Sequence, residues 1–202
     1  GNTALHCCCR QEVNGANTLH FLLDFISSAG SSVLFKNLSS KNHEQQTPLH
    51  VACQNGRDNV VDVFLQQVGV SLLSKLLVLQ DSQQQTPLLA AVAAGSTDIV
   101  MSLLMWRGNN YICSTPTKPC PLAWAVRSRN VDMVQLLLEF NDPTSESGYN
   151  LNAALMEAVI SKSTLDDGDN DDMRIKIVGI LVAAGANPCI AKDDEQCTVV
   201  FA

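Results

Sequence analysis

A histidine followed by three cysteines, His6-Cys7-Cys8-Cys9, is the part of the sequence that most suggests chemistry. Thiolates and imidazoles bind zinc, and a cysteine beside a histidine base can act as a nucleophile. Structural zinc sites, however, need two separated pairs of ligands. Adjacent cysteines on a helix point in directions about 100° apart. This spacing therefore does not predict a metal site, and the catalytic interpretation needs an element that holds the histidine as a base.

A second candidate is the acidic segment 166–172, with the sequence DDGDNDD. Calcium loops of the EF-hand type need alternating oxygen ligands, a glycine at the sixth position and a glutamate at the twelfth. Counted from Asp167, these positions hold Asp172 and Val178. The match fails, and a solvated acidic loop is the better interpretation.

Composition excludes several classes of function. The net charge is −7 and the 13 lysines and arginines are scattered, which argues against direct nucleic-acid binding. The longest apolar runs, such as Leu76–Leu79, are too short for membrane insertion. The eight cysteines lack a preceding signal peptide, so we expect reduced thiols in the cytoplasm or nucleus. No phosphate-binding loop or nucleophile-elbow motif is present, so no cofactor is expected and nothing supports an enzyme.

One pattern returns along the whole chain and changes the meaning of these local motifs. The segment TPLHVAC at 47–53 recurs as TPLLAAV at 86–92 and as CPLAWAV at 120–126. Further copies begin near 3 and 153, and a copy near 197 is cut off by the end of the sequence. Each full copy is followed by a second apolar segment. A repeat architecture is therefore predicted.

The repeat resembles the ankyrin repeat, a unit of about 33 residues with a T-P-L-H-x-A signature. The resemblance implies an all-α solenoid of stacked helix-turn-helix units with finger-like loops, with about five full repeats and a truncated one in a single domain, 1–202. Threonine suits the helix cap and proline the first helical position. One helix pair cannot bury its own apolar face, so stability comes from stacking the copies.

When the copies of the repeat are aligned, the residues His6 to Cys9 are better interpreted as structural than as chemically active. His6 and His50 share a signature position, and we expect their imidazoles to bridge backbone groups of neighbouring repeats. Cys8 and Cys9 fall where the second repeat has Ala52 and Cys53. Small side chains there allow neighbouring helices to pack closely, which favours packing over catalysis.

Four insertions separate the chain from the family unit. We expect extra residues between the helices of the first repeat, around 12–17, and a longer exit through 31–41. The second repeat is extended around 68–80, where residues 70–77 can form an extra helical turn or a short added helix. The fifth repeat carries the acidic loop, around 161–172.

Ankyrin partners usually contact the finger-like loops and the ends of the first helices. Carried over position by position, the resemblance implies loop contacts at His43, Glu44, Gln46, Ser82, Gln83, Gln85, Tyr149, Asn150 and Asn152. It implies helix-end contacts at Arg10, Gln11, Gln54, Asn55, Arg127, Ser128 and Ser161. This amide-rich face suits hydrogen bonding to an extended peptide. Arginine and tyrosine dominate many interfaces, so Arg127 and Tyr149 are expected to contribute most.

The function that follows is a non-catalytic module that binds a partner protein or peptide and serves as a scaffold, adaptor or regulator. The sequence begins within a repeat and ends inside a first helix, so we expect it to belong to a larger protein. A monomer is expected. The alternative is a structural role through intramolecular docking or dimerisation, and an enzyme is the least supported interpretation.

Overall fold

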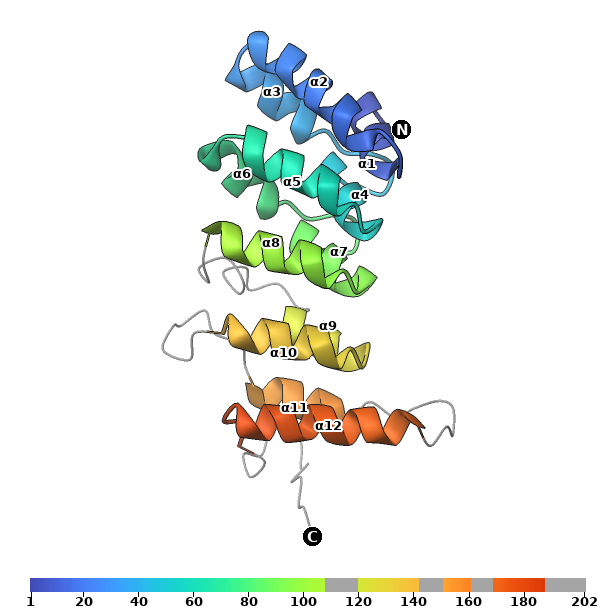
Figure 1. Ribbon diagram of the computed structural model, residues 1–202, viewed down its shortest axis with the longest axis vertical. Helices are drawn as coiled ribbons and strands as arrows, with labels where there is room; N and C mark the ends of the chain where they lie inside the picture. Colours follow the sequence, from blue (N-terminus) through green and yellow to red (C-terminus); the bar gives the residue numbers. More distant parts are fainter. Residues whose placement is uncertain (108–119, 142–150, 161–168, 188–202) are drawn as a thin grey trace. The chain divides into compact units, whose positions relative to one another are not determined.

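The computed structural model describes residues 1–107, 120–141, 151–160 and 169–187 (Figure 1). All regular secondary structure in these ranges is helical, which confirms the all-α prediction. The chain divides into two compact units. The first comprises Gly1–Gly108 with Thr115–Lys118, and the second comprises Asn109–Ser114 with Pro119–Ala202.

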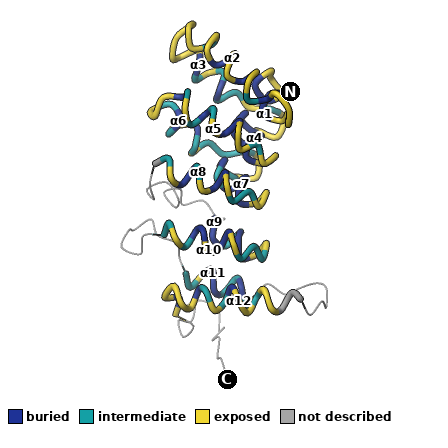
Figure 2. The backbone as a smooth tube through the Cα atoms, in the orientation of Figure 1, coloured by how far each residue is buried: buried dark blue, intermediate teal, exposed yellow. Residues whose placement is uncertain are grey.

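The first unit contains three repeats, each with an inner and an outer helix. The inner helices are α1 (Ala4–Arg10), α4 (Pro48–Gln54) and α7 (Pro87–Ala94), and the outer helices are α2 (Gly15–Ser28), α5 (Asp58–Gln67) and α8 (Thr97–Arg107). Inner helices pack on inner helices and outer on outer along the unit. Buried residues lie where these helices face one another (Figure 2). The predicted repeat frame is therefore confirmed here.

Local chemistry explains where the inner helices begin and end. Proline occupies the first turn of α4 and α7, where its missing N–H breaks no intrahelical bond. The Thr86 hydroxyl accepts a hydrogen bond from the Leu89 N–H, which caps α7. Gly95 ends α7 with a φ of 74°, a left-handed conformation that glycine adopts without strain.

The two long repeats add helices rather than loops. We expected a longer exit at 31–41, but Ser31–Leu38 forms α3, because Leu34 and Leu38 lie one turn apart and are both buried. The expected insertion at 12–17 is also partly helical, since α2 already begins at Gly15. Of the extra turn and the short added helix expected at 70–77, the structure shows the helix, α6 (Val70–Leu77), with Leu73 and Leu76 buried.

The second unit contains two helix pairs: α9 (Pro121–Arg127) with α10 (Val131–Glu139), and α11 (Leu151–Ile160) with α12 (Asp169–Ala183). These pairs match the fourth and fifth predicted repeats. Helix α12 begins at Asp169, so the last part of the expected acidic loop is helical instead. Residues 161–168 and the truncated copy near 197 lie outside the described residues.

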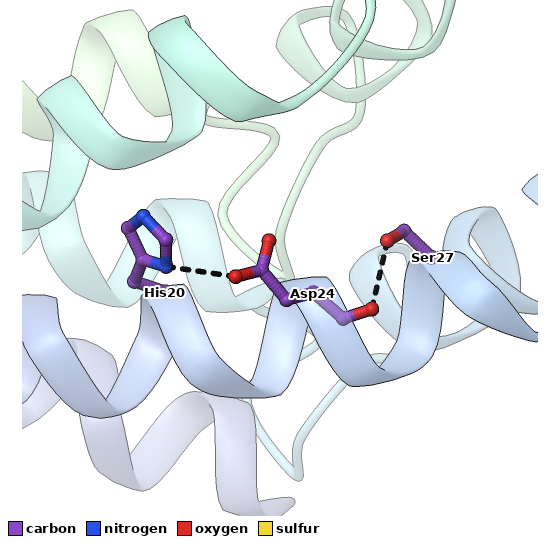
Figure 3. Close-up of polar contacts among 3 residues, drawn as sticks. All are labelled: His20, Asp24 and Ser27. Atoms are coloured by element: carbon purple, nitrogen blue, oxygen red, sulfur yellow. Dashed lines mark hydrogen bonds and ion pairs between the residues drawn. The ribbon is translucent and has the colours of Figure 1, made fainter.

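The outer surface of α2 carries a short polar line beside two aromatic rings. The Nδ1 atom of His20 lies 3.1 Å from a carboxylate oxygen of Asp24, and the Ser27 hydroxyl donates to the Asp24 carbonyl at 2.9 Å (Figure 3). Phe21 and Phe25 on the same helix are 76% and 78% exposed. Exposed ion pairs contribute little stability, so this line does not explain why α2 forms. Burial of Leu19 and Leu23 on the inner face of α2 explains its formation.

Two buried imidazoles bridge consecutive repeats, as predicted. The Nε2 atom of His6 lies 2.9 Å from the carbonyl oxygen of Gln46, and that of His50 lies 3.0 Å from the carbonyl oxygen of Gln85. A carbonyl oxygen can only accept, so each Nε2 carries the proton. Each Nδ1 then accepts from the backbone N–H of the capping threonine, at 3.2 and 3.3 Å. The neutral imidazole is the form that satisfies both bonds.

Burial makes protonation of these imidazoles unfavourable. Desolvation lowers the pKa of both His6 and His50, although the bond to the neighbouring carbonyl acts in the opposite direction. In the unfolded chain a histidine has a pKa of about 6.5. The folded protein therefore binds fewer protons than the unfolded chain as the pH falls below that value.

We expect the free energy of unfolding contributed by these histidines to be constant above pH ~6.5 and to fall below it, by up to about 1.4 kcal/mol per pH unit for each. Urea unfolding at a series of pH values measures this. The variant carrying His6→Leu and His50→Leu, which repeats the Leu89 of the third repeat at both positions, should lose most of the slope. His43→Ala, at an exposed histidine, should keep it. An equal slope in the double variant and the parent would contradict the assignment.

Candidate functional site

The turn before α4, residues 42–46, is built around one amide side chain and is called the first finger. The Oδ1 atom of Asn42 accepts from the N–H groups of Glu44 and Gln46, both at 2.9 Å. The Asn42 N–H donates to the Gln46 carbonyl at 3.0 Å. Gln45 at the tip has a φ of 59°. These bonds fix the shape of the finger from within.

The second finger, residues 81–85, repeats this geometry. The Oδ1 atom of Asp81 accepts from the N–H groups of Gln83 and Gln85, at 2.8 and 2.9 Å. The two fingers are also joined, because the Ser82 N–H donates to the Glu44 carbonyl at 3.1 Å. The fingers therefore form a continuous edge of the first unit, and the imidazoles of the inner helices hold their bases.

A cleft of about 510 Å³ lies beside the first finger and the ends of α1 and α4. It is lined by Asn2, Arg10, Asn42, His43, Glu44, Gln46, Val51, Gln54 and Asn55. The structure therefore brings together all the candidates predicted on the first finger and on the ends of the first two inner helices, apart from Gln11. We call this feature the finger cleft.

Side-chain amides form the floor of the finger cleft. Gln46 is only 7% exposed, and its Nε2 donates to the Gln54 Oε1 at 2.7 Å. The Asn42 Nδ2 lies 3.2 Å from the Asn2 Oδ1 and 3.4 Å from the Gln46 Oε1. Gln46, predicted as a contact residue, thus braces its neighbours. The floor is held in place before any ligand arrives.

The rim of the finger cleft carries the charges. Arg10 and Glu44 are exposed on opposite elements, α1 and the first finger. Neither Arg10 nor Glu44 forms an ion pair with a described residue, so neither rim charge is neutralised there. The rim can therefore offer one guanidinium and one carboxylate to a ligand above the amide floor.

Three lining residues were not predicted. Asn42 had a usable signal, because an Asn or Asp stands four residues before the last glutamine of both fingers. No sequence signal marked Asn2 and Val51, because they come together at the cleft only through the stacking of α1 against α4. Val51 is buried and gives the cleft its one apolar wall residue.

The other predicted contact residues lie elsewhere. Gln83 is exposed on the second finger, whereas Gln85 is half-buried with its carbonyl bound to His50. In the second unit, Arg127 is exposed at the end of α9. There the Asn152 Oδ1 accepts from the Asn187 N–H at 2.7 Å. Tyr149, Asn150 and Ser161 lie outside the described residues.

The cysteine cluster is part of the packing. Cys8, Cys9 and Cys53 are buried, and burial raises the pKa of all three thiols. Cys7 is exposed, and both ring nitrogens of His6 are already bonded. Over the described ranges no three His, Cys, Asp or Glu side chains are grouped to hold a metal ion. The interpretation of Cys8 and Cys9 as packing residues is confirmed.

Inner and outer helices pair in stacked repeats, and buried histidines tie two inner helices to the fingers that follow. These features define a helical-repeat protein with a cleft along its finger edge. A family model described as ankyrin repeats (3 copies) matches residues 1–75, 25–113 and 70–154. The chain belongs to the ankyrin-repeat family. No curated protein matches the sequence. None of the helices among the described residues is long and apolar enough to span a membrane.

Similar solved structures share the fold at low identity. The ankyrin repeat domain of Bcl-3, described as a unique member of the IkappaB family, is 21% identical with a TM-score of 0.63, over 100% of this chain and 95% of that one. An ankyrin repeat domain from Acinetobacter baumannii is 23% identical with a TM-score of 0.62, over 94% and 85%. A chain from a complex of a predatory endopeptidase of Bdellovibrio bacteriovorus with an immunity protein is 18% identical with a TM-score of 0.56, over 93% and 84%.

The burial of the thiols predicts which cysteines react. A short pulse of iodoacetamide under native conditions should modify Cys7 and leave Cys9 and Cys53 intact, because alkylation needs an accessible thiolate. Peptide mapping by mass spectrometry measures the yield at each site, and the same pulse in urea should modify all of them. Rapid selective labelling of Cys9 or Cys53 in the folded protein would contradict the packing role.

Proposed function

We propose that this domain is a non-catalytic interaction module that binds an extended peptide segment of a partner protein in the finger cleft. The observation that carries the proposal is an amide floor, already ordered by its own hydrogen bonds, beneath two unpaired rim charges, Arg10 and Glu44. Because these side chains are already ordered, less side-chain entropy is lost when a ligand binds.

The chemistry of the lining favours a peptide backbone as the ligand. Asn and Gln side chains both donate and accept hydrogen bonds, so they can match the alternating N–H and C=O groups of an extended chain. An acidic side chain in the ligand would meet Arg10, and a basic one would meet Glu44.

The wider role proposed is that of a scaffold, adaptor or regulator within a longer protein in a reducing compartment. Free cysteines in the described residues suit such a compartment. The Bdellovibrio structure, a complex of two proteins, supports the view that this fold is used in protein association. A fold hosts many functions, so the weight of the proposal rests on the finger cleft.

A structural role through self-association is the second candidate, and the exposed rings of Phe21 and Phe25 on α2 favour it. Light scattering over a range of concentrations tests it, and we expect a monomer. A dimer that dissociates in the variant Phe21→Ser with Phe25→Ser would instead support the second candidate.

The peptide-binding proposal predicts that Arg10 selects ligands. Peptides selected from a random displayed library on the parent domain should bind the Arg10→Glu variant at least about tenfold more weakly, because an interface arginine often contributes more than 1 kcal/mol. Fluorescence anisotropy with the selected peptides measures the affinity. Lys176→Glu makes the same change of charge on α12, outside the cleft, and should leave the affinity for the selected peptides unaltered.

Circular dichroism and the unfolding midpoint confirm that each variant is folded before its affinity is compared. Arg10→Lys should retain part of the affinity, because it keeps the charge but not the planar fork. Full affinity in a variant that combines Arg10→Glu with Gln54→Ala would show that the peptides bind elsewhere and would overturn the proposal.

A further inference from the structure

The two helices that the first repeats add to the family unit lie together. Helices α3 and α6 follow the outer helices of consecutive repeats and appear on the same side of the first unit (Figure 1). The Nζ atom of Lys75 on α6 lies 5.8 Å from the centre of the Phe35 ring on α3, a cation–π contact. The finger cleft takes no residue from either helix. The added helices therefore form a surface of their own.

The charge of this surface is opposite to that of the chain. The segments 31–41 and 68–80 contain three lysines and no aspartate or glutamate, in a protein with 20 acidic residues and a net charge of −7. Lys36, Lys41 and Lys75 are all exposed. The Lys41 Nζ donates to the Gln80 carbonyl at 2.7 Å, which ties the exits of the two repeats together without neutralising the charge.

Apolar side chains accompany the lysines. Leu34, Leu38, Leu73 and Leu76 are buried beneath α3 and α6. Beyond this core, Val33 is 40% exposed, Val70 is 57% exposed and Val78 is 40% exposed. We call the exposed residues Val33, Lys36, Val70, Lys75 and Val78 the added-helix face. It offers both apolar area and positive charge.

The acidic residues of the adjoining outer helices form no ion pair with these lysines. On α2, the Asp24 carboxylate lies 3.1 Å from the His20 ring of the same helix and contacts no lysine of α3 or α6 as an ion pair (Figure 3). On α5, Asp58 lies in the first turn, at the opposite end of the helix from α6. Asp62, in the middle of α5, is exposed and forms no ion pair with a described residue. Lys36, Lys41 and Lys75 are therefore free of ion pairs with the described residues.

We propose that the added-helix face is a second interaction surface, which docks an acidic segment of a partner protein that also carries apolar residues. Carboxylates in such a segment would meet the lysines, and its apolar side chains would cover the exposed valines. Charge complementarity of this kind raises the rate of association and rejects basic partners. This proposal does not depend on the finger cleft, because the two surfaces share no residue.

The test uses a fluorescein-labelled peptide of alternating glutamate and leucine, with a matched peptide of lysine and leucine. The parent domain should bind the acidic peptide, less tightly as salt is added, and should not bind the basic one. Lys36→Glu with Lys75→Glu should weaken binding roughly tenfold, on the scale of a few exposed ion pairs. Lys36→Arg with Lys75→Arg preserves charge and ring contact and should bind as the parent does.

Two further variants separate the contributions. Val33→Ser with Val78→Ser keeps every charge and should weaken binding several-fold through lost apolar contact. Arg10→Glu alters only the finger cleft. This variant should bind the acidic peptide with the affinity of the parent, even if its affinity for ligands of the cleft falls. Circular dichroism establishes that all variants are folded.

Three results would overturn the proposal. The first is equal affinity of the Lys36→Glu, Lys75→Glu variant and the parent for the acidic peptide. The second is failure of the parent to bind that peptide at low salt. The third is binding to vesicles that contain phosphatidylserine, lost in the same variant, with no binding of the peptide, which would assign the surface to anionic lipid.

Discussion

Close packing between the inner helices is the constraint on which the rest of the first unit depends. Ala52, Cys53 and Ala91 are fully buried where α1, α4 and α7 stack. Small side chains let these helices approach, as a lone repeat cannot bury its own apolar face. The same short spacing brings each buried imidazole within reach of the next finger, and it brings the Ser82 N–H to the Glu44 carbonyl. The geometry of the finger cleft is thus a consequence of helix spacing.

Sequence periodicity was sufficient for the repeats and the helix at 70–77, because both rest on local spacing. The bridging role of His6 and His50 followed from their position in the family signature, since these bonds join residues 40 and 35 positions apart. It was insufficient for α3, whose helical state depends on burying Leu34 and Leu38 against the rest of the unit. Only some residues of the finger cleft could be predicted from the sequence. Family resemblance placed Arg10 and Gln54 near partners, but not the bond between Gln46 and Gln54, which turns a predicted contact residue into part of the floor. Side chains from separate repeats meet there, and no local pattern encodes that meeting.

The third repeat lacks the bridging histidine, so comparison with it shows what that histidine contributes to the first two repeats. Leu89 stands where the first two repeats have His6 and His50, and it is buried as an apolar residue. Its helix keeps the threonine cap through the Leu89 N–H but has no imidazole to hold a following loop. The histidine bridges, the joined fingers and the added helices thus all belong to the first two repeats and the link to the third. Among the described residues, these three departures from a regular repeat stack therefore lie in the first unit.

The two surfaces of the first unit follow different physical rules. Recognition in the finger cleft combines ordered amides, whose hydrogen bonds are directional and respond weakly to salt, with the two rim charges of Arg10 and Glu44. Attraction to the added-helix face depends on exposed lysines, whose influence extends over about 8–10 Å and fades as salt is added. A partner that engaged both would be drawn in by charge and then selected by hydrogen bonding, with the second contact made at a high effective concentration. Because the lysines lie on segments outside the family unit, that attraction can change without altering the stack that shapes the cleft.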